Sequence, residues 1–248
     1  MKRIILLTIF SMLVSVSVAA TGSDNEYYSS GKLMSSATKN VVDGLKIRSV
    51  KIFYESGVLK SEFSTYRAKL HGIQKDYYEN GQTKEVSNWF GGKKSGVNNT
   101  YSDNGKLIME ASYVSGNYDG ALKLYDNDGN LVSETHFANG VLNGISTTYY
   151  KNNKPSSEVN YVNGIKQGVA KTYHINGALA TEVNYMDNKT NGAAKNYDQG
   201  GKVESEVNFI DDKPDGLQKT YGEDGKVRDE MEYSKGKKLG KRHIINDK

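Results

Sequence analysis

Glutamate is the residue best placed for chemistry in this chain, because it recurs at one position of a regular pattern. Paired carboxylates serve general acid–base catalysis and cation binding. If the surrounding segments fold as hairpins, however, each glutamate faces a lysine, threonine or asparagine, which indicates surface pairing instead. The members stand 24 residues apart, with Val86 in the one gap: Glu62, Glu110, Glu134, Glu158, Glu182, Glu206 and Glu230.

The other candidates for catalysis or metal binding do not form sites. Asp126–Asn127–Asp128–Gly129 is similar to the start of a calcium-binding loop, but the remaining ligands of that loop are missing. The chain has no cysteine, and we find no nucleophile beside a base. We therefore predict no enzyme activity and no catalytic, cofactor or metal site. The four histidines share no position in the pattern: His71, His136, His174 and His243.

A row of aromatic residues is the candidate binding surface. Two roles compete for it. The rings can form the packing layer of a repeat array, which must bury apolar surface between its units. They can also remain partly exposed as a contact surface for a partner. This aromatic stripe consists of Trp89, Tyr113, Phe137, Tyr161, Tyr185, Phe209 and Tyr233.

Both rows follow from a repeat of 24 residues that runs through most of the chain. A glycine marks every copy, and nine residues later most copies carry an Asn-Gly or Asp-Gly dipeptide. So regular a repeat indicates stacked structural units. The marker glycines are Gly72, Gly96, Gly120, Gly144, Gly168, Gly192, Gly216 and Gly240.

Each unit is predicted to be one β-hairpin. Asn-Gly and Asp-Gly are favoured in two-residue type I′ turns. A turn centred on Asp128–Gly129 places Lys123 opposite Glu134, and the same rule places Tyr161 opposite Gly144. Alternation of apolar and polar residues after the turn supports strands. We expect an all-β fold in which tandem antiparallel hairpins form an elongated, twisted, single-layer β-meander.

The first residues have the pattern of a secretory signal peptide. A basic start, Met1–Lys2–Arg3, precedes an almost wholly apolar run from Ile4 to Val18 and then small residues suited to cleavage near Ala20. The run is shorter than the roughly 20 residues that span a membrane. We expect export to the periplasm, the cell surface or the medium.

The rest of the chain divides into three parts. Residues 21–47 are a polar lead-in with a degenerate capping repeat, 48–239 hold eight hairpin repeats, and 240–248 form a polar tail. The net charge is +4, and both signs are interspersed along the repeats. Because no face of one sign can follow a phosphate backbone, nucleic acid is not an expected partner.

The repeat unit resembles a known family. Tyr77–Tyr78–Glu79–Asn80–Gly81 and the connecting segment Gly92–Lys93–Lys94–Ser95–Gly96 are similar to the MORN repeat, in its bacterial variant. The resemblance covers roughly 48–240 and implies an elongated open sheet used for binding and scaffolding, without catalytic residues. Some bacterial relatives are labelled antitoxin-like. Asn188 and Asp212 replace the first glycine of the connecting segment, so those two connections are expected to differ in shape.

These observations favour an exported scaffold that binds protein at the cell envelope or outside the cell. A glycan-binding or cell-wall-binding module is the alternative, although such repeats are rich in tryptophan and this chain has one. An antitoxin-like component is a further alternative. Membrane contact is expected to be peripheral at most, because the charges are mixed.

Overall fold

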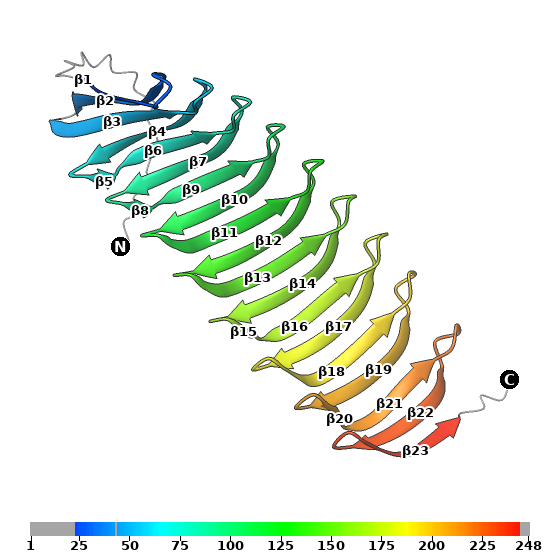
Figure 1. Ribbon diagram of the computed structural model, residues 1–248. Coiled ribbons are helices and arrows are strands. Elements are labelled where there is room, and N and C mark those ends of the chain that lie inside the picture. Colours follow the sequence, from blue (N-terminus) through cyan, green and yellow to red (C-terminus); the bar gives the residue numbers. More distant parts are fainter. Residues whose placement is uncertain (1–22, 43, 244–248) are drawn as a thin grey trace, which may run out of the picture.

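The computed structural model describes residues 23–42 and 44–243. Within them the chain forms one antiparallel sheet whose strands follow one another in sequence order, from β1 (Ser23–Tyr27) to β23 (Lys237–His243). The two-residue strands β5, β8, β15 and β20 pair only with the strand before them, which pairs also with the strand after them. Figure 1 shows the hairpins side by side along an elongated open sheet, with β1 and β23 at opposite ends. The predicted all-β, single-layer meander is confirmed.

The remaining strands have the following bounds. In the first half they are β2 (Leu33–Val42), β3 (Leu45–Phe53), β4 (Leu59–Tyr66), β5 (Lys69–Leu70), β6 (Gly72–Tyr77), β7 (Thr83–Phe90), β8 (Lys93–Lys94), β9 (Gly96–Tyr101), β10 (Leu107–Val114), β11 (Asn117–Tyr125) and β12 (Leu131–Ala138). In the second half they are β13 (Val141–Tyr149), β14 (Pro155–Val162), β15 (Ile165–Lys166), β16 (Gly168–Tyr173), β17 (Leu179–Met186), β18 (Lys189–Tyr197), β19 (Val203–Ile210), β20 (Lys213–Pro214), β21 (Gly216–Tyr221) and β22 (Val227–Ser234).

The register predicted within each hairpin is confirmed. Lys123 lies opposite Glu134, and Tyr161 lies opposite Gly144. Side chains alternate between the two faces along a strand, so each row of the repeat occupies one face. We call the face with the lysines and glutamates the ladder face, and the other the aromatic face. The same pairing joins Lys51–Glu62, Lys171–Glu182, Lys195–Glu206 and Lys219–Glu230.

The turn inside each hairpin differs from the prediction. Between β11 and β12, Asp126 N–H donates to Asn130 O (2.9 Å) and Gly129 N–H donates to Asp126 O (3.0 Å). Of these turn residues only Gly129 has a positive φ, +91°. This matches a three-residue loop with a glycine bulge, not a type I′ turn. The longer loop shifts the strand register by one residue, and a second bulge at Val132 reverses this shift, so the strands beyond the turn pair as predicted.

Turns with two positive φ values lie between the hairpins instead. Ser115 (φ 52°) and Gly116 (φ 91°) are one example, and this pattern is that of a type I′ turn. The expectation for Asn188 and Asp212 was wrong. Their φ values of 68° and 65° lie in the same left-handed region as that of Gly92, 85°. Asparagine and aspartate tolerate this region better than most residues, so the connections keep one shape.

The marker glycines lie in bulges between neighbouring hairpins. Tyr113 faces Tyr118 whereas Ala111 faces Leu122, so two additional residues are accommodated around Gly120, whose φ is 101°. Only glycine adopts such a conformation readily. A Cβ built on the equivalent Gly168 would meet no atom within 4 Å. The positive φ therefore explains why glycine stands at this position. The aromatic ring on the opposite strand does not require it.

The two ends of the repeat array can be compared with the predicted domain boundaries. The predicted signal peptide, residues 1–20, lies outside the described residues. β1 and β2 form a hairpin before the first full repeat, and Tyr28 Oη donates to Phe53 O (2.7 Å), as the equivalent Tyr54 does to Tyr77 O (2.8 Å). β23 runs to His243, into the segment predicted as a tail.

Candidate functional site

A row of charged side chains crosses the ladder face from hairpin to hairpin. Lys123 Nζ lies 3.4 Å from Glu110 Oε1 of the preceding hairpin, although Glu134 is its partner within its own hairpin. The bond to Glu110 raises the pKa of Lys123. Lys219 Nζ likewise lies 3.6 Å from Glu206 Oε1 of the preceding hairpin. The carboxylates therefore join neighbouring hairpins, a role that the sequence analysis did not foresee.

Tyrosine hydroxyls bind the same carboxylates. In four repeats the tyrosine at the end of the first strand donates to the glutamate of the preceding hairpin. The pKa of each of these tyrosines is raised to about 12. Burial is the larger cause for Tyr77 and Tyr173, followed by the hydrogen bond to the glutamate. For Tyr197 and Tyr221 that hydrogen bond is the larger cause, followed by burial. The pairs are Tyr77–Glu62 (2.7 Å), Tyr173–Glu158 (2.8 Å), Tyr197–Glu182 (2.6 Å) and Tyr221–Glu206 (2.7 Å).

The glutamate row is thus engaged in structural bonds. The part of the chain that the structure describes contains no group of three or more histidine, aspartate or glutamate side chains arranged to hold a metal ion. Asp126, in the segment similar to a calcium loop, accepts hydrogen bonds from the Asp128 and Asn130 backbone N–H groups, both 2.9 Å. The hydrogen bond from the Asn130 side chain, and after it these backbone bonds, lower the pKa of Asp126. This aspartate closes its own turn.

The predicted aromatic stripe lies on the aromatic face. Tyr113 is buried, at 9% exposure, and the other six members are half-buried. Tyr118, from the connecting strand, lies between two members, with its ring centroid 4.8 Å from that of Tyr113 and 5.2 Å from that of Phe137. This burial favours the packing role. A binding role for the stripe stays a prediction.

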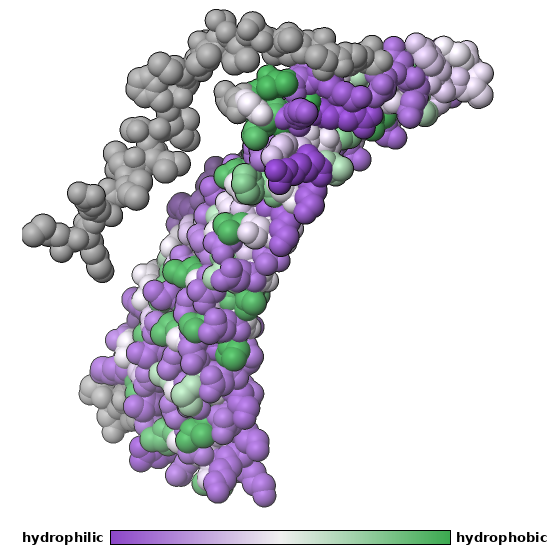
Figure 2. Space-filling view, turned by 90° about the vertical axis from the view of Figure 1, so that its left-hand side faces the viewer, coloured by the Kyte–Doolittle hydropathy of each residue, from purple (hydrophilic) through white to green (hydrophobic). Residues whose placement is uncertain are grey.

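Exposed apolar residues gather instead on the ladder face, where the alternation pattern predicted polar side chains. They form two rows, one directly after the marker glycines and one directly before the type I′ turns, with exposures from 45% at Val162 to 72% at Phe90. Figure 2 shows hydrophobic residues at intervals along the side of the molecule that carries these turns. The apolar rows are Ile73, Val97, Ile145, Val169 and Leu217, and Phe90, Val114, Val162, Met186 and Ile210.

The apolar rows are the residues that sequence reasoning missed. Their signal was present, because a large apolar residue recurs at 24-residue spacing in most repeats, with alanine at Ala121, Ala138 and Ala193. Shallow hollows repeat beside them on the ladder face. Equivalent residues of two repeats line two of these hollows: Glu62, Ser64, Ile73 and Lys75 in one, and Glu206, Asn208, Leu217 and Lys219 in the other.

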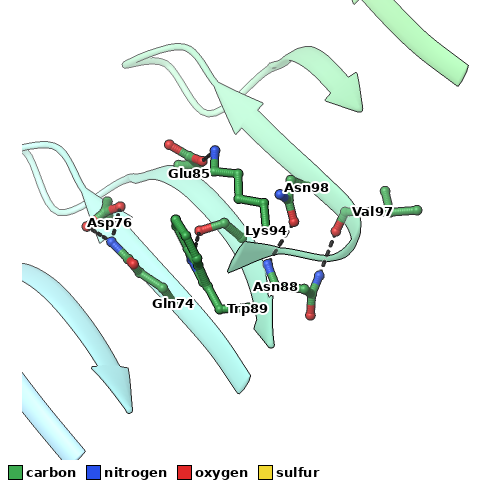
Figure 3. A network of polar contacts seen from close by, with 9 residues as sticks. Gln74, Asp76, Glu85, Asn88, Trp89, Lys94, Val97 and Asn98 are labelled. Atoms are coloured by element: carbon green, nitrogen blue, oxygen red, sulfur yellow. Dashed lines mark hydrogen bonds and ion pairs between the residues drawn. The ribbon is translucent and has the colours of Figure 1, made fainter. Parts of the chain in front are cut away.

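One place on the aromatic face departs from the repeat (Figure 3). Asp76 of β6 lies directly opposite Glu85 of β7. Gln74 Nε2 donates to both carboxylate oxygens of Asp76, at 3.1 and 2.9 Å. Lys94 Nζ lies 2.6 Å from Glu85 Oε1 and 5.9 Å from the centre of the Trp89 ring. We call these five residues the Trp89 cluster.

Comparison with protein families identifies the repeat. A family model described as "MORN repeat variant" matches residues 49–67, 70–89, 94–115, 118–139, 142–163, 190–211 and 214–235, more than half of the chain. The chain belongs to the MORN repeat variant family.

MORN repeats are in general protein- or membrane-binding modules, and the family is one of repeat scaffolds, not of enzymes. The hairpin of β16 and β17 falls between two matched segments, yet it shares a contact with the matched hairpins, since Tyr173 binds Glu158 as its counterparts bind theirs. The described residues include no helix that is both long and apolar enough to cross a membrane.

Comparison with curated proteins gives no match. Among solved structures, the MORN array is similar to part of one titled "Crystal Structure of TcdB2-TccC3-TEV", with 12% identity and a TM-score of 0.23. That alignment covers 84% of this chain and 12% of the other, so the chain spans about an eighth of that structure's length.

Proposed function

We propose that this MORN-repeat protein is an exported, non-enzymatic scaffold that binds another protein at the cell envelope or outside the cell. The observation that carries the proposal is the pair of apolar rows, ten side chains that are each at least 45% exposed on one face. Large exposed apolar patches are rare on soluble monomers and mark interaction sites. Full burial of an exposed side chain of this size gains about 1.5–3 kcal/mol. Each row member is already partly covered, so its burial would gain roughly half of that.

The surroundings of the apolar rows favour a protein as partner. Polar side chains such as Asn160 and Asn184 lie between row members, and the ladder beside them carries both charges. An apolar centre with a polar rim of mixed charge is typical of protein interfaces. The bonds of the ladder hold neighbouring hairpins together, so the rows keep a fixed spacing.

Substitution within the rows tests the proposal. The purified protein, used as bait in envelope extracts, is expected to retain a partner that the double variant Val162→Asp/Met186→Asp loses. Ile175→Asp is the matched control, because Ile175 is 65% exposed but lies in a hairpin turn at the other edge of the sheet. Circular dichroism establishes that all three proteins fold alike. Equal capture by the row variant, or no captured protein, contradicts the proposal.

Export rests on the basic, apolar and small-residue pattern of residues 1–20. N-terminal sequencing of protein recovered outside the cytoplasm is expected to begin near Ala20 or Thr21. Material that accumulates in the cytoplasm with Met1 intact contradicts export.

A further inference from the structure

The Trp89 cluster breaks the repeat on the aromatic face at a single hairpin. At the position of Asp76 other repeats carry Thr100, Leu124, Thr148, Thr172, Asn196 and Thr220. At the position of Glu85 they carry Met109, Ser133, Ser157, Thr181, Ser205 and Asp229. Among the described hairpins, only that of β6 and β7 places two carboxylates opposite each other. Sites where local rules are broken in an otherwise consistent array are expected to be functional.

Directly opposed carboxylates destabilise a strand pair, so this arrangement has a cost. Two neighbours reduce it. Lys94 neutralises Glu85 at 2.6 Å, whereas Asp76 receives its bonds from the uncharged amide of Gln74. Asp76 and Glu85 are both half-buried, so their remaining acceptor positions reach the surface of the aromatic face. The cluster therefore presents hydrogen-bond acceptors beside the only tryptophan of the chain.

A buried amide lies next to the cluster. Asn98 is 2% exposed, and its Oδ1 accepts the Asn88 backbone N–H at 2.7 Å. Its Nδ2 is buried and has no hydrogen-bond partner within the described part of the chain. Figure 3 shows the Asn98 side chain beside that of Lys94. This donor is closed to solvent and lies on the Lys94 side of Trp89, so it marks strain beside the cluster and is not a contact for a surface ligand.

The Trp89 ring offers an apolar platform on the side away from Lys94. Its cross-strand partner is Gly72, which has no side chain, and a Cβ built there would meet no atom within 4 Å. Trp89 Nε1 donates to Ser87 Oγ at 2.9 Å, which fixes the ring in place. A flat, rigid aromatic surface with convergent polar groups at its border is the usual composition of a small-ligand site.

We infer that the Trp89 cluster binds an uncharged carbohydrate, whose ring lies on Trp89 while its hydroxyl groups bind Asp76 and Gln74 of the neighbouring strand β6. The chemistry of the cluster disfavours other ligands. Lys94 Nζ already lies over the rings of Trp89 and Tyr113, at 5.9 and 5.4 Å, and so occupies the place of a cation. Anions are repelled by the two carboxylates. An apolar ligand would displace the water that donates hydrogen bonds to the Asp76 carboxylate and would offer no donor in its place, which is unfavourable.

The single tryptophan makes the inference directly testable, because intrinsic tryptophan fluorescence reports on this site alone. The folded protein is titrated separately with cellotetraose, chitotetraose, maltotetraose and mannotetraose. At least one is expected to shift the emission in a saturable manner. Asp76→Thr/Glu85→Ser, which restores residues found in other repeats, is expected to fold normally and to weaken binding about tenfold or more.

A matched double variant, Thr172→Val/Thr181→Val, changes the equivalent positions of β16 and β17 and is expected to bind like the unchanged protein. The inference is overturned if none of the four sugars shifts the emission, or if Asp76→Thr/Glu85→Ser binds equally well. Tighter binding of choline or of a lysine peptide than of any sugar also overturns it. The site lies on the face opposite the apolar rows, so these outcomes are independent of protein capture.

Discussion

At the scale of single residues, tyrosine determines how neighbouring hairpins are joined. In four repeats the tyrosine that ends the first strand binds the glutamate of the preceding hairpin, as Tyr197 binds Glu182 at 2.6 Å. A tyrosine at the start of the turn binds the backbone of the following hairpin, as Tyr150 Oη donates to Tyr173 O at 2.6 Å. Both kinds of bond cross between hairpins, so these tyrosines join neighbouring repeats as well as packing between them.

These bonds predict an alkaline transition. Tyr77, Tyr173, Tyr197 and Tyr221 have a pKa of about 12 in the folded protein, above the ordinary value of 10.0. Because the folded-state pKa is the higher one, their contribution to stability is complete below pH 10 and is lost as the pH rises from about 10 through 12. Tyrosinate absorbance of the folded protein is expected to show four groups ionising near pH 12.

Glu182→Gln is the control for this titration, since it removes the charge beside Tyr197 but keeps an acceptor. Tyr197 is then expected to ionise closer to pH 10, while the other three tyrosines still ionise near pH 12. A titration curve unchanged by Glu182→Gln would show that the carboxylate does not hold the proton of Tyr197.

At the scale of elements, the sequence predicted the strands and their pairing but not the turns. Repeat spacing determines which residues face each other, so the Lys123–Glu134 and Tyr161–Gly144 pairs were predictable. Turn type depends on φ at each position, and Asp128–Gly129 is compatible with more than one loop. The compensating bulge at Val132 has no signature in the sequence.

The exposure of the apolar rows was also beyond sequence reasoning. Alternation identifies two faces, but it assumes that apolar residues lie on the covered face. In a single-layer sheet neither face is covered by a second layer, so Val169 and Ile145 remain exposed on the face that carries the charges. Only the placement of neighbouring side chains decides this exposure. It puts the apolar rows and the aromatic stripe on opposite faces.

The type I′ connections predict which asparagines matter. Asn188→Ala is expected to lower the free energy of unfolding by about 1–2 kcal/mol, because alanine is strained in the left-handed region. The change also removes the Asn188 side chain that accepts the Lys166 backbone N–H at 2.8 Å. Asn127→Ala is the matched control, since Asn127 is an exposed turn residue without a positive φ, and it is expected to cost less than about 0.5 kcal/mol. Equal urea midpoints for the two variants would contradict this account of the connections.

At the scale of the whole molecule, the open sheet provides a long surface in which each hairpin contacts only its neighbours. Stability is then close to a sum of repeat and interface terms, and the surface grows with the number of repeats. Among the described residues, β1 and β23 each pair with one strand only, so each end of the sheet has a free strand edge there. At β23 this edge carries Lys237, Lys238, Lys241 and Arg242, and charged edge strands disfavour aggregation through edge pairing.

The central claim is that the apolar rows of the ladder face contact a protein partner, and site-specific photo-crosslinking tests it most directly. A photoreactive amino acid is placed at Met186, 52% exposed within the rows, or at Ile175, 65% exposed in a hairpin turn, in cells that produce the full chain. We predict a discrete protein adduct from position 186 that is absent from position 175. No adduct at position 186, or the same adducts from both positions, would contradict the account.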